Sequence, residues 1–89
     1  MSWKLRYSAK AEKQLSKLDA QQSRIIVAWL MKHINECEDP RAFGGPLTAS
    51  FEGKWRYRIG SYRVLVDIND DSLVVLALQI GHRRDIYSK

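Results

Sequence analysis

The sequence predicts an α+β fold: a strand, two helices and a three-stranded antiparallel meander, with both helices packed on one face of the sheet. Three observations carry this prediction. The chain has 89 residues, enough for one hydrophobic core and too few for two. Its N-terminal half combines one alternating segment with two helical patterns, and from residue 54 onward the strand period of two dominates. We therefore expect residues 1–89 to form one domain.

The N-terminal half of the chain predicts one strand and two helices. Residues 2–7 alternate between apolar and polar side chains, as in a half-buried strand. Ser8 can cap a short amphipathic helix, and Asp19 can cap a second helix over about residues 20–36, which contains no glycine or proline. Pro40 lacks a backbone N–H and is expected to prevent this helix from continuing.

The C-terminal half predicts the meander. Residues 41–53 are rich in glycine and proline and show little periodicity, which indicates a crossing loop. Residues 54–59 alternate, residues 60–61 form a Gly-Ser two-residue turn, and residues 62–68 return as the next strand. Residues 73–80 are almost continuously apolar, which is typical of a strand buried on both faces.

The charge balance is the most unusual property of the composition. Fifteen lysines and arginines against ten acidic residues give a net charge of +5, whereas 45% hydrophobic and 28% charged residues are ordinary for a folded domain. A basic chain of this kind suits a polyanion or an acidic partner protein. A basic surface without such a role is the alternative.

Cysteine usage and hydropathy exclude several other classes. The single cysteine, Cys37, excludes an internal disulfide framework and a multi-thiolate metal site, and it suits a reducing cytoplasm. The longest apolar run, residues 25–31, has seven residues where a membrane span needs about 20. The sequence shows no secretory signal pattern. We expect a cytoplasmic protein that does not cross a membrane.

The two-residue turn fixes the pairing of the hairpin around it. In the resulting register Arg58 lies opposite Arg63, and Lys54 lies opposite Asp67. The apolar face must pack on the helices, so the other face carries Lys54, Arg56, Arg58 and Arg63. Two arginines directly opposite each other form a like-charge pair that lowers stability. An anionic ligand is the simplest explanation, because arginine matches phosphate oxygens bidentately; solvated positions that limit aggregation are the alternative.

The last strand decides whether the C-terminal tail joins this basic face. Its even positions are all large and apolar: Val74, Leu76, Leu78 and Ile80. We expect them to face the helices, which requires an odd-length turn or a bulge near residues 70–72. A continuing strand would then place Arg83 on the same face as the arginines of the hairpin.

Several segments resemble one protein family. Residues 55–64, the apolar strand and residues 81–87 resemble the RelE toxins of bacterial toxin–antitoxin systems, in the RelE/ParE superfamily, as do residues 39–41 and 46–47. The resemblance spans essentially the whole chain. It implies a ribosome-dependent endoribonuclease that cuts mRNA in the A site of the 70S ribosome by attack of a 2′-hydroxyl on the adjacent phosphate, without metal or other cofactor.

The resemblance also implies a protein partner. Such toxins are held inactive by a cognate antitoxin of the RelB kind, and we expect one that is acidic or amphipathic. It would cover the basic face or displace the tail, and the apolar surface of the second helix is a candidate docking site. An antitoxin dimer would make the complex higher-order.

The candidate catalytic residues are Arg56, Arg58, Arg63, His82, Arg83 and Tyr87. The resemblance supplies all of them except His82. Arg56 and Arg58 stand where these toxins usually have lysine, and an arginine is a poor general base because it stays protonated. His82 is the candidate base, since imidazole changes charge near neutral pH, although its position in the strand should face the helices. Tyr87 would stack on a base or orient the 2′-hydroxyl. The alternative for His82 is a packed or surface histidine, and the alternative for Tyr87 is an aromatic residue that only packs on the sheet.

The other polar residues are expected either to bind RNA or to have no functional role. The candidate RNA-binding residues are Lys54, Arg84, Lys4, Arg6, Lys10 and Lys13; for the N-terminal group a solvated helix face is the alternative. His33 lies on the apolar helix and is expected to be partly buried or on the helix surface. The acidic neighbours of Cys37 would raise the pKa of its thiol and make it a poor nucleophile.

Two other functions remain open at this stage. One is a ParE-type toxin of the same fold that binds DNA gyrase and has no nuclease activity; the arginine set and the tail tyrosine disfavour it. The other is a small RNA-binding domain whose basic sheet only positions phosphates, and it predicts salt-sensitive RNA binding without cleavage.

Overall fold

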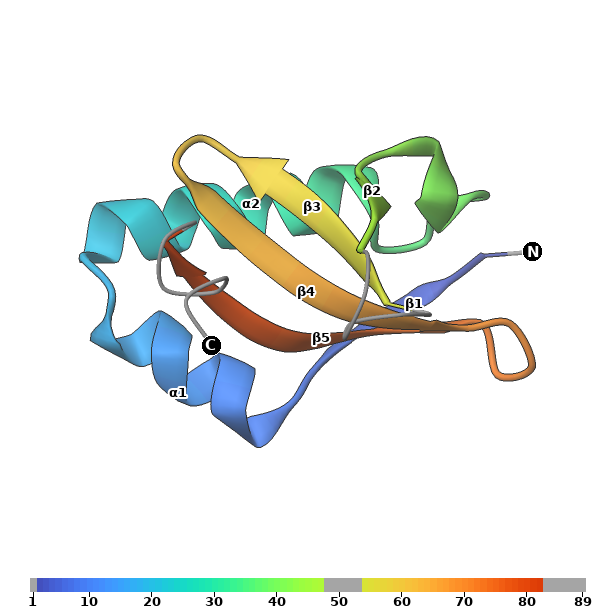
Figure 1. The fold of residues 1–89 in the computed structure, drawn as a ribbon, viewed down its shortest axis with the longest axis horizontal. Helices are drawn as coiled ribbons and strands as arrows, with labels where there is room; N and C mark the ends of the chain where they lie inside the picture. The colour runs from blue at the N-terminus through green and yellow to red at the C-terminus, as the bar shows by residue number, and fades with distance from the viewer. Residues whose placement is uncertain (1, 48–53, 83–89) are drawn as a thin grey trace.

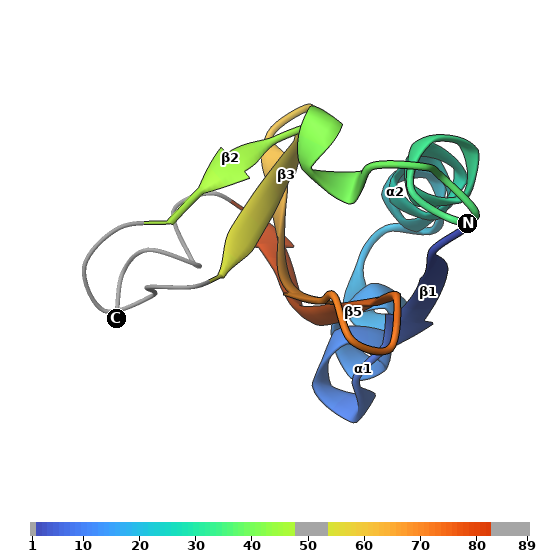
Figure 2. The same ribbon diagram turned by 90° about the vertical axis from the view of Figure 1, so that its right-hand side faces the viewer.

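The structure, a computed structural model, describes residues 2–47 and 54–82. The elements follow in the order β1 (Lys4–Tyr7), α1 (Ala9–Lys17), α2 (Ala20–His33), a 3₁₀ turn η1 (Pro40–Ala42), β2 (Gly45–Pro46), β3 (Trp55–Ile59), β4 (Tyr62–Asn69) and β5 (Val74–His82). The strands form a sheet in the order β1-β5-β4-β3-β2 (Figure 1). β1 runs parallel to β5, and the other neighbours are antiparallel. Both helices pack on this twisted sheet, α2 over one face and α1 along the edge of β5 (Figure 2), so the predicted α+β architecture is confirmed.

Both helices begin where the sequence predicts. The Ser8 hydroxyl accepts a hydrogen bond from the Ala11 N–H at 3.0 Å at the start of α1. The Asp19 carboxylate accepts from the N–H groups of Gln21 and Gln22 at the start of α2. Each side chain satisfies backbone donors that have no partner within the helix, which explains why the chain turns helical at these points.

The end of α2 differs from the prediction. The helix stops at His33 rather than near residue 36, and Glu36 adopts a positive φ of 62°. The N–H of Glu36 donates to the carbonyl of Trp3 at 2.7 Å, so a contact with the residue before β1 replaces the next helical turn. Pro40 comes after this point and opens η1, so it does not terminate the helix.

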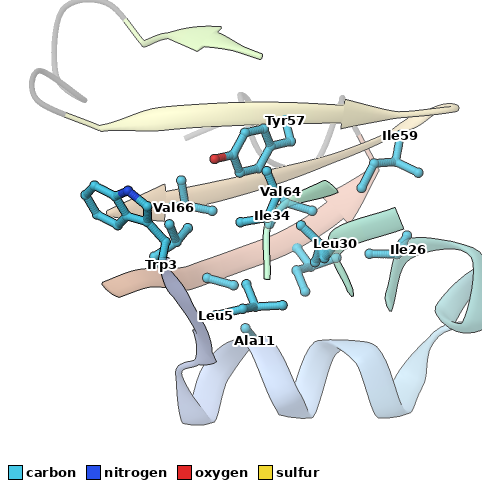
Figure 3. Packing of buried hydrophobic residues seen from close by; sticks show 13 residues of the cluster. Trp3, Leu5, Ala11, Ile26, Leu30, Ile34, Tyr57, Ile59, Val64 and Val66 are labelled. Atoms are coloured by element: carbon cyan, nitrogen blue, oxygen red, sulfur yellow. The ribbon is translucent and has the colours of Figure 1, made fainter. Parts of the chain in front are cut away.

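The core lies between the helices and the inner face of the sheet. Tyr57, Val64 and Val66 from the hairpin are fully buried against Ile26 and Leu30 of α2 and the remaining cluster members (Figure 3). This is the packing that the alternation of the hairpin strands predicts. Within residues 2–47 and 54–82, no helix combines the length and the apolar character needed to cross a membrane.

The β3–β4 hairpin has the predicted register. Arg58 pairs with Arg63, and the ammonium group of Lys54 lies 3.7 Å from the carboxylate of Asp67. Gly60 occupies the first turn position with a φ of 61°, the conformation that a type II′ turn requires there. A two-residue turn of this type leaves the strands only one register, which is why the sequence sufficed to derive it.

A β-bulge in the interior of the sheet was not predicted. Leu65 pairs with Gln79, whereas Val66 pairs with Ala77, so Leu78 is an extra residue on β5. The odd-length turn or bulge expected near residues 70–72 is therefore replaced by a bulge farther along the strand. Side chains of β5 change faces at this point.

The bulge overturns the predicted orientation of most of β5. Val75 and Ala77 are fully buried in the core before the bulge, and Ile80 is buried there after it. The other even positions, Val74, Leu76 and Leu78, are only half-buried. The prediction that the whole even set faces the helices is thus right for Ile80 and wrong for the rest.

The crossing loop also contains a short strand that the sequence did not reveal. Gly45 and Pro46 form β2, which pairs with Arg56 and Trp55 at the outer edge of the hairpin. Two residues of glycine and proline carry no strand signal, because the pairing depends on the partner strand and not on local propensity.

Candidate active site

A hollow lies where the β3–β4 turn meets the C-terminal end of β5. It measures about 240 Å³ and is lined by Arg58, Gly60, Ser61, Arg63 and His82. We call it the hairpin hollow. Arg58 comes from β3, Arg63 from β4 and His82 from β5, so three strands bring three of the predicted catalytic residues to one place.

The two arginines of the hairpin hollow differ in environment. Arg58 is exposed, whereas Arg63 is only 7% exposed and is the one buried charged residue of the described chain. The alternative interpretation as solvated strand positions is therefore wrong for Arg63. A guanidinium removed from water interacts more strongly with an anion than an exposed one, because the surrounding dielectric constant is lower.

His82 reaches the hollow from the end of β5. It pairs with Tyr62 of β4, and the two rings meet edge to face with centroids 5.7 Å apart. The strand continues through Gly81, so His82 occupies a regular strand position on the same face as the buried Ile80, as its place in the sequence predicts, and lines the hollow from there. The imidazole is exposed, which leaves it accessible for proton transfer.

Arg56 does not line the hairpin hollow. Its guanidinium Nη1 donates to the carbonyl of Pro46 at 3.2 Å. A Cβ atom at Gly45 would lie 2.8 Å from that nitrogen, so the glycine provides the space in which the side chain crosses β2. The structure thus gives Arg56 a contact that ties β2 to the hairpin.

The remaining predicted site residues fall into two groups. Arg83, Arg84 and Tyr87 lie outside the described residues. Lys54 and Lys4 form exposed ion pairs with acidic side chains, at 3.7 Å to Asp67 and at 2.9 Å to Glu36. Exposed pairs of this kind are weak, so a stronger anion can replace the carboxylate. Arg6, Lys10 and Lys13 are exposed on β1 and α1.

A second hollow borders the first, and sequence reasoning missed it. It measures about 260 Å³, lies between α1 and the end of β5, and shares His82 with the hairpin hollow. We call it the α1 hollow; its lining includes Gln14, Lys17, Leu18, Tyr62 and Ile80. The side-chain oxygen of Gln14 accepts the N–H of Ile80 at 2.6 Å. A glutamine on a polar helix face carries no sequence signal for such a role.

Other titratable groups lie away from these hollows. The imidazole of His33 packs between the rings of Trp29 and Phe43, with centroids 4.8 and 5.1 Å away, as expected for a partly buried histidine. Burial raises the pKa of the Cys37 thiol, and the charge of Asp39 adds to this effect. Within residues 2–47 and 54–82, no group of three or more His, Cys, Asp or Glu side chains is arranged to hold a metal ion.

Comparison with known proteins gives a consistent result. The sequence profile described as the ParE toxin of the type II toxin–antitoxin system parDE matches residues 5–87. Toxin RelG of Mycobacterium tuberculosis (strain ATCC 25618 / H37Rv) is 29% identical over 89 residues, which covers 100% of both chains.

Solved structures share the fold. A toxin–antitoxin complex from Mycobacterium tuberculosis, RelBE2, matches with a TM-score of 0.83 and 26% identity over 93% of each chain. A mutant of the E. coli toxin RelE in the free state matches with a TM-score of 0.77 and 22% identity, covering 99% of this chain and 93% of that one. An archaeal RelE–RelB complex from Pyrococcus horikoshii OT3 matches with a TM-score of 0.65 and 20% identity, covering 93% of this chain and 97% of that one.

Proposed function

Since the chain belongs to the ParE toxin family of type II toxin–antitoxin systems, we propose that it is an endoribonuclease that cuts mRNA in the ribosomal A site. The observation that carries this proposal is the hairpin hollow, where Arg58, Arg63 and His82 from three strands meet. One buried and one exposed cation, together with an exposed imidazole, are the groups that phosphodiester cleavage needs.

The proposed reaction is an internal transesterification. His82 takes the proton of the ribose 2′-hydroxyl, and the 2′-oxygen forms a bond to the adjacent phosphorus while the bond to the 5′-oxygen breaks. Water supplies a proton to the departing 5′-oxygen, and the hydroxide that remains takes the proton from the His82 imidazolium, which restores both water and the neutral base. The products are a 2′,3′-cyclic phosphate and a 5′-hydroxyl end.

The arginines stabilise the charge that develops on the phosphate oxygens. Arg63 is held in a buried position, so little reorganisation is needed when the transition state forms. Arg58 is exposed and can close on the phosphate from the solvent side. Arg83 and Tyr87 stay predicted catalytic residues, and Arg84, Arg6, Lys10 and Lys13 stay predicted RNA contacts.

A protein partner is part of the proposal. The similar toxins from Mycobacterium tuberculosis and Pyrococcus horikoshii were solved as toxin–antitoxin and RelE–RelB complexes. We expect a cognate antitoxin of the RelB kind for this chain, acidic or amphipathic, which inhibits cleavage. A dimeric antitoxin would give a higher-order complex.

The proposal is tested by adding purified protein to a translating extract and mapping mRNA ends by primer extension. Wild-type protein should cut within codons, and the same mRNA without ribosomes should stay intact. Arg58→Ala and His82→Ala should lose cutting and stay folded, because both side chains are exposed. Lys32→Ala, at an exposed lysine on α2, is the control and should cut normally. Folded wild-type protein that leaves mRNA intact would refute the proposal.

One observation favours a second function. The matching family profile carries the ParE description, so a gyrase-binding toxin without nuclease activity is the alternative. Inhibition of DNA supercoiling by the purified chain, without mRNA cleavage, would support that alternative.

A further inference from the structure

The α1 hollow has the chemistry of a nucleotide site, and of its lining residues the proposed nuclease reaction uses only His82. We propose that it is a subsite for the nucleotide next to the cut phosphate, which holds the base against its apolar floor and the neighbouring phosphate at Lys17. This inference rests on the proposed function. If the cut phosphate lies beside His82, which lines both hollows, the next nucleotide of the RNA can enter the α1 hollow.

The lining provides surfaces that suit a base. Leu18 and Tyr62 are half-buried members of the lining, Ile80 is buried beneath it, and the rings of Tyr62 and His82 are in edge-to-face contact. Aromatic side chains bind bases of any sequence because every base has a π face. A hollow of about 260 Å³ is smaller than most drug-sized pockets, which is appropriate for a single base.

The charge of the lining favours an anion. Lys17 stands exposed at the end of α1, and none of the described residues that line the hollow is acidic. The side chain of Gln14 adds an amide N–H group that can hydrogen-bond a base edge. Each of the two hollows that share His82 therefore has at least one cationic side chain in its lining, Lys17 in one and Arg58 and Arg63 in the other.

The hollow is held open by contacts between α1 and the edge of β5. β1 pairs with β5 only as far as Ala77, so beyond that point α1 side chains take the place of a neighbouring strand. The Ser8 hydroxyl donates to the carbonyl of Leu78 at 3.0 Å, and the Gln14 oxygen accepts the Ile80 N–H. These two bonds fix the helix on the strand edge, so the site exists before a ligand binds.

The test measures binding of uncleavable RNA by NMR titration of the ¹⁵N-labelled full chain. The probes are a dinucleotide whose first ribose lacks the 2′-hydroxyl, and trinucleotides extended by one nucleotide at the 5′ or the 3′ end. One of the two extensions should lower the Kd by at least about fivefold, which is the smallest effect expected for stacking one base on an aromatic side chain. It should also shift the Gln14 side-chain amide and the Ile80 N–H.

Matched variants identify the site. Lys17→Ala should remove most of the gain from the extension and leave the dinucleotide Kd unchanged. Lys32→Ala, at a lysine in the last turn of α2, is the control and should keep the full gain. The inference is wrong if neither extension tightens binding, or if both lysine variants lose the gain equally.

The outcomes separate this inference from the proposed function. If the chain cuts RNA but neither extension lowers the Kd, the nuclease function stands and the subsite is refuted. Extension-dependent binding at the α1 hollow by a chain that cuts no RNA would keep the subsite and eliminate the nuclease. No binding of any probe would overturn the subsite, since wild-type protein must bind the extended RNA.

Discussion

Arg58 and Arg63 lie directly opposite each other on β3 and β4, so two guanidinium groups share one face of the sheet at the hairpin hollow. Like charges in this arrangement lower the stability of a sheet by roughly 0.2–1 kcal/mol. A phosphate bound between them would convert the repulsion into charge-assisted hydrogen bonds. The pair therefore connects the stability of the fold directly to the proposed function.

Arg58→Thr should stabilise the protein and inactivate it. Removing one charge of the pair should raise the free energy of unfolding by about 0.5 kcal/mol, because threonine also favours a strand. Loss of one charge-stabilising group should lower the cleavage rate about 100-fold. Urea denaturation and cleavage in a translating extract measure the two effects. Arg58→Lys keeps the repulsion and should give no gain in stability; a threonine variant that is less stable and fully active would contradict the account.

Gly44 and Gly60 form a matched pair for backbone strain. Both have a positive φ, 74° and 61°, but a Cβ at Gly44 would clash with the carbonyl oxygen of Arg56, whereas no atom of the described residues lies within 4 Å of a Cβ at Gly60. Gly60→Ala should therefore lower the free energy of unfolding by only about 1–2 kcal/mol. Gly44→Ala should cost more than twice as much, because β2 must move away from β3. Equal losses in urea denaturation would refute the close approach.

Tyr57 and Tyr7 should respond oppositely to removal of the hydroxyl group. The buried Tyr57 hydroxyl donates to the carbonyl of Pro40 at 2.8 Å, and burial raises its pKa well above the ordinary value, so it stays a donor at neutral pH. Tyr57→Phe should cost about 1 kcal/mol.

The Tyr7 hydroxyl is buried without a hydrogen-bond partner among the described residues. Tyr7→Phe should therefore leave stability unchanged or raise it by up to about 1 kcal/mol, because it removes a buried polar atom. Thermal denaturation of both variants gives the comparison. A loss of stability in Tyr7→Phe as large as that in Tyr57→Phe would contradict the assignment.

The ion pair between Arg41 and Asp70 should make a small pH-dependent contribution to stability. The guanidinium donates to both carboxylate oxygens at 3.0 Å, and this lowers the pKa of Asp70 below its ordinary value of 3.8. The folded state therefore binds this proton more weakly than the unfolded state, so the contribution is present above pH 4 and disappears as the pH falls through the lowered pKa.

Asp70→Asn should accordingly lower the melting temperature slightly at pH 7 and low salt. At pH 2 the variant and the wild type should melt alike. Both groups are exposed, so 1 M salt should also remove most of the difference. An equal difference at both pH values would show that the ion pair is not its cause.

The hairpin shows how far the sequence determines the site. A two-residue turn with glycine at its first position leaves one register, so the Arg58–Arg63 pair followed from the sequence. The burial of Arg63 could not be predicted from the sequence, because it depends on what the rest of the fold places over that part of the sheet. The predicted contribution of Arg83 and Tyr87 falls outside the described residues.

β5 shows where sequence reasoning fails. A large apolar residue at each even position favoured one face, yet the small residue Ala77 is fully buried and Leu78 forms the bulge. Ser8, at the start of α1, donates its N–H to the carbonyl of Ala77 at 2.9 Å, so the helix approaches this part of the strand closely. In the sequence, a small residue that is buried because a helix approaches the strand closely cannot be told from a small residue on the surface. The contact of Gln14 with Ile80 has the same origin in long-range packing.

The most direct test of the central claim is the chemistry of the RNA ends that the chain produces on translating ribosomes. Cleavage by the hairpin hollow predicts a 2′,3′-cyclic phosphate and a 5′-hydroxyl end, and a 2′-deoxy nucleotide at the cut position should block the reaction. His82→Ala should abolish both products in the folded protein. A 5′-phosphate end, or undiminished cleavage at the 2′-deoxy position, would contradict attack by the 2′-hydroxyl and with it the assigned role of His82.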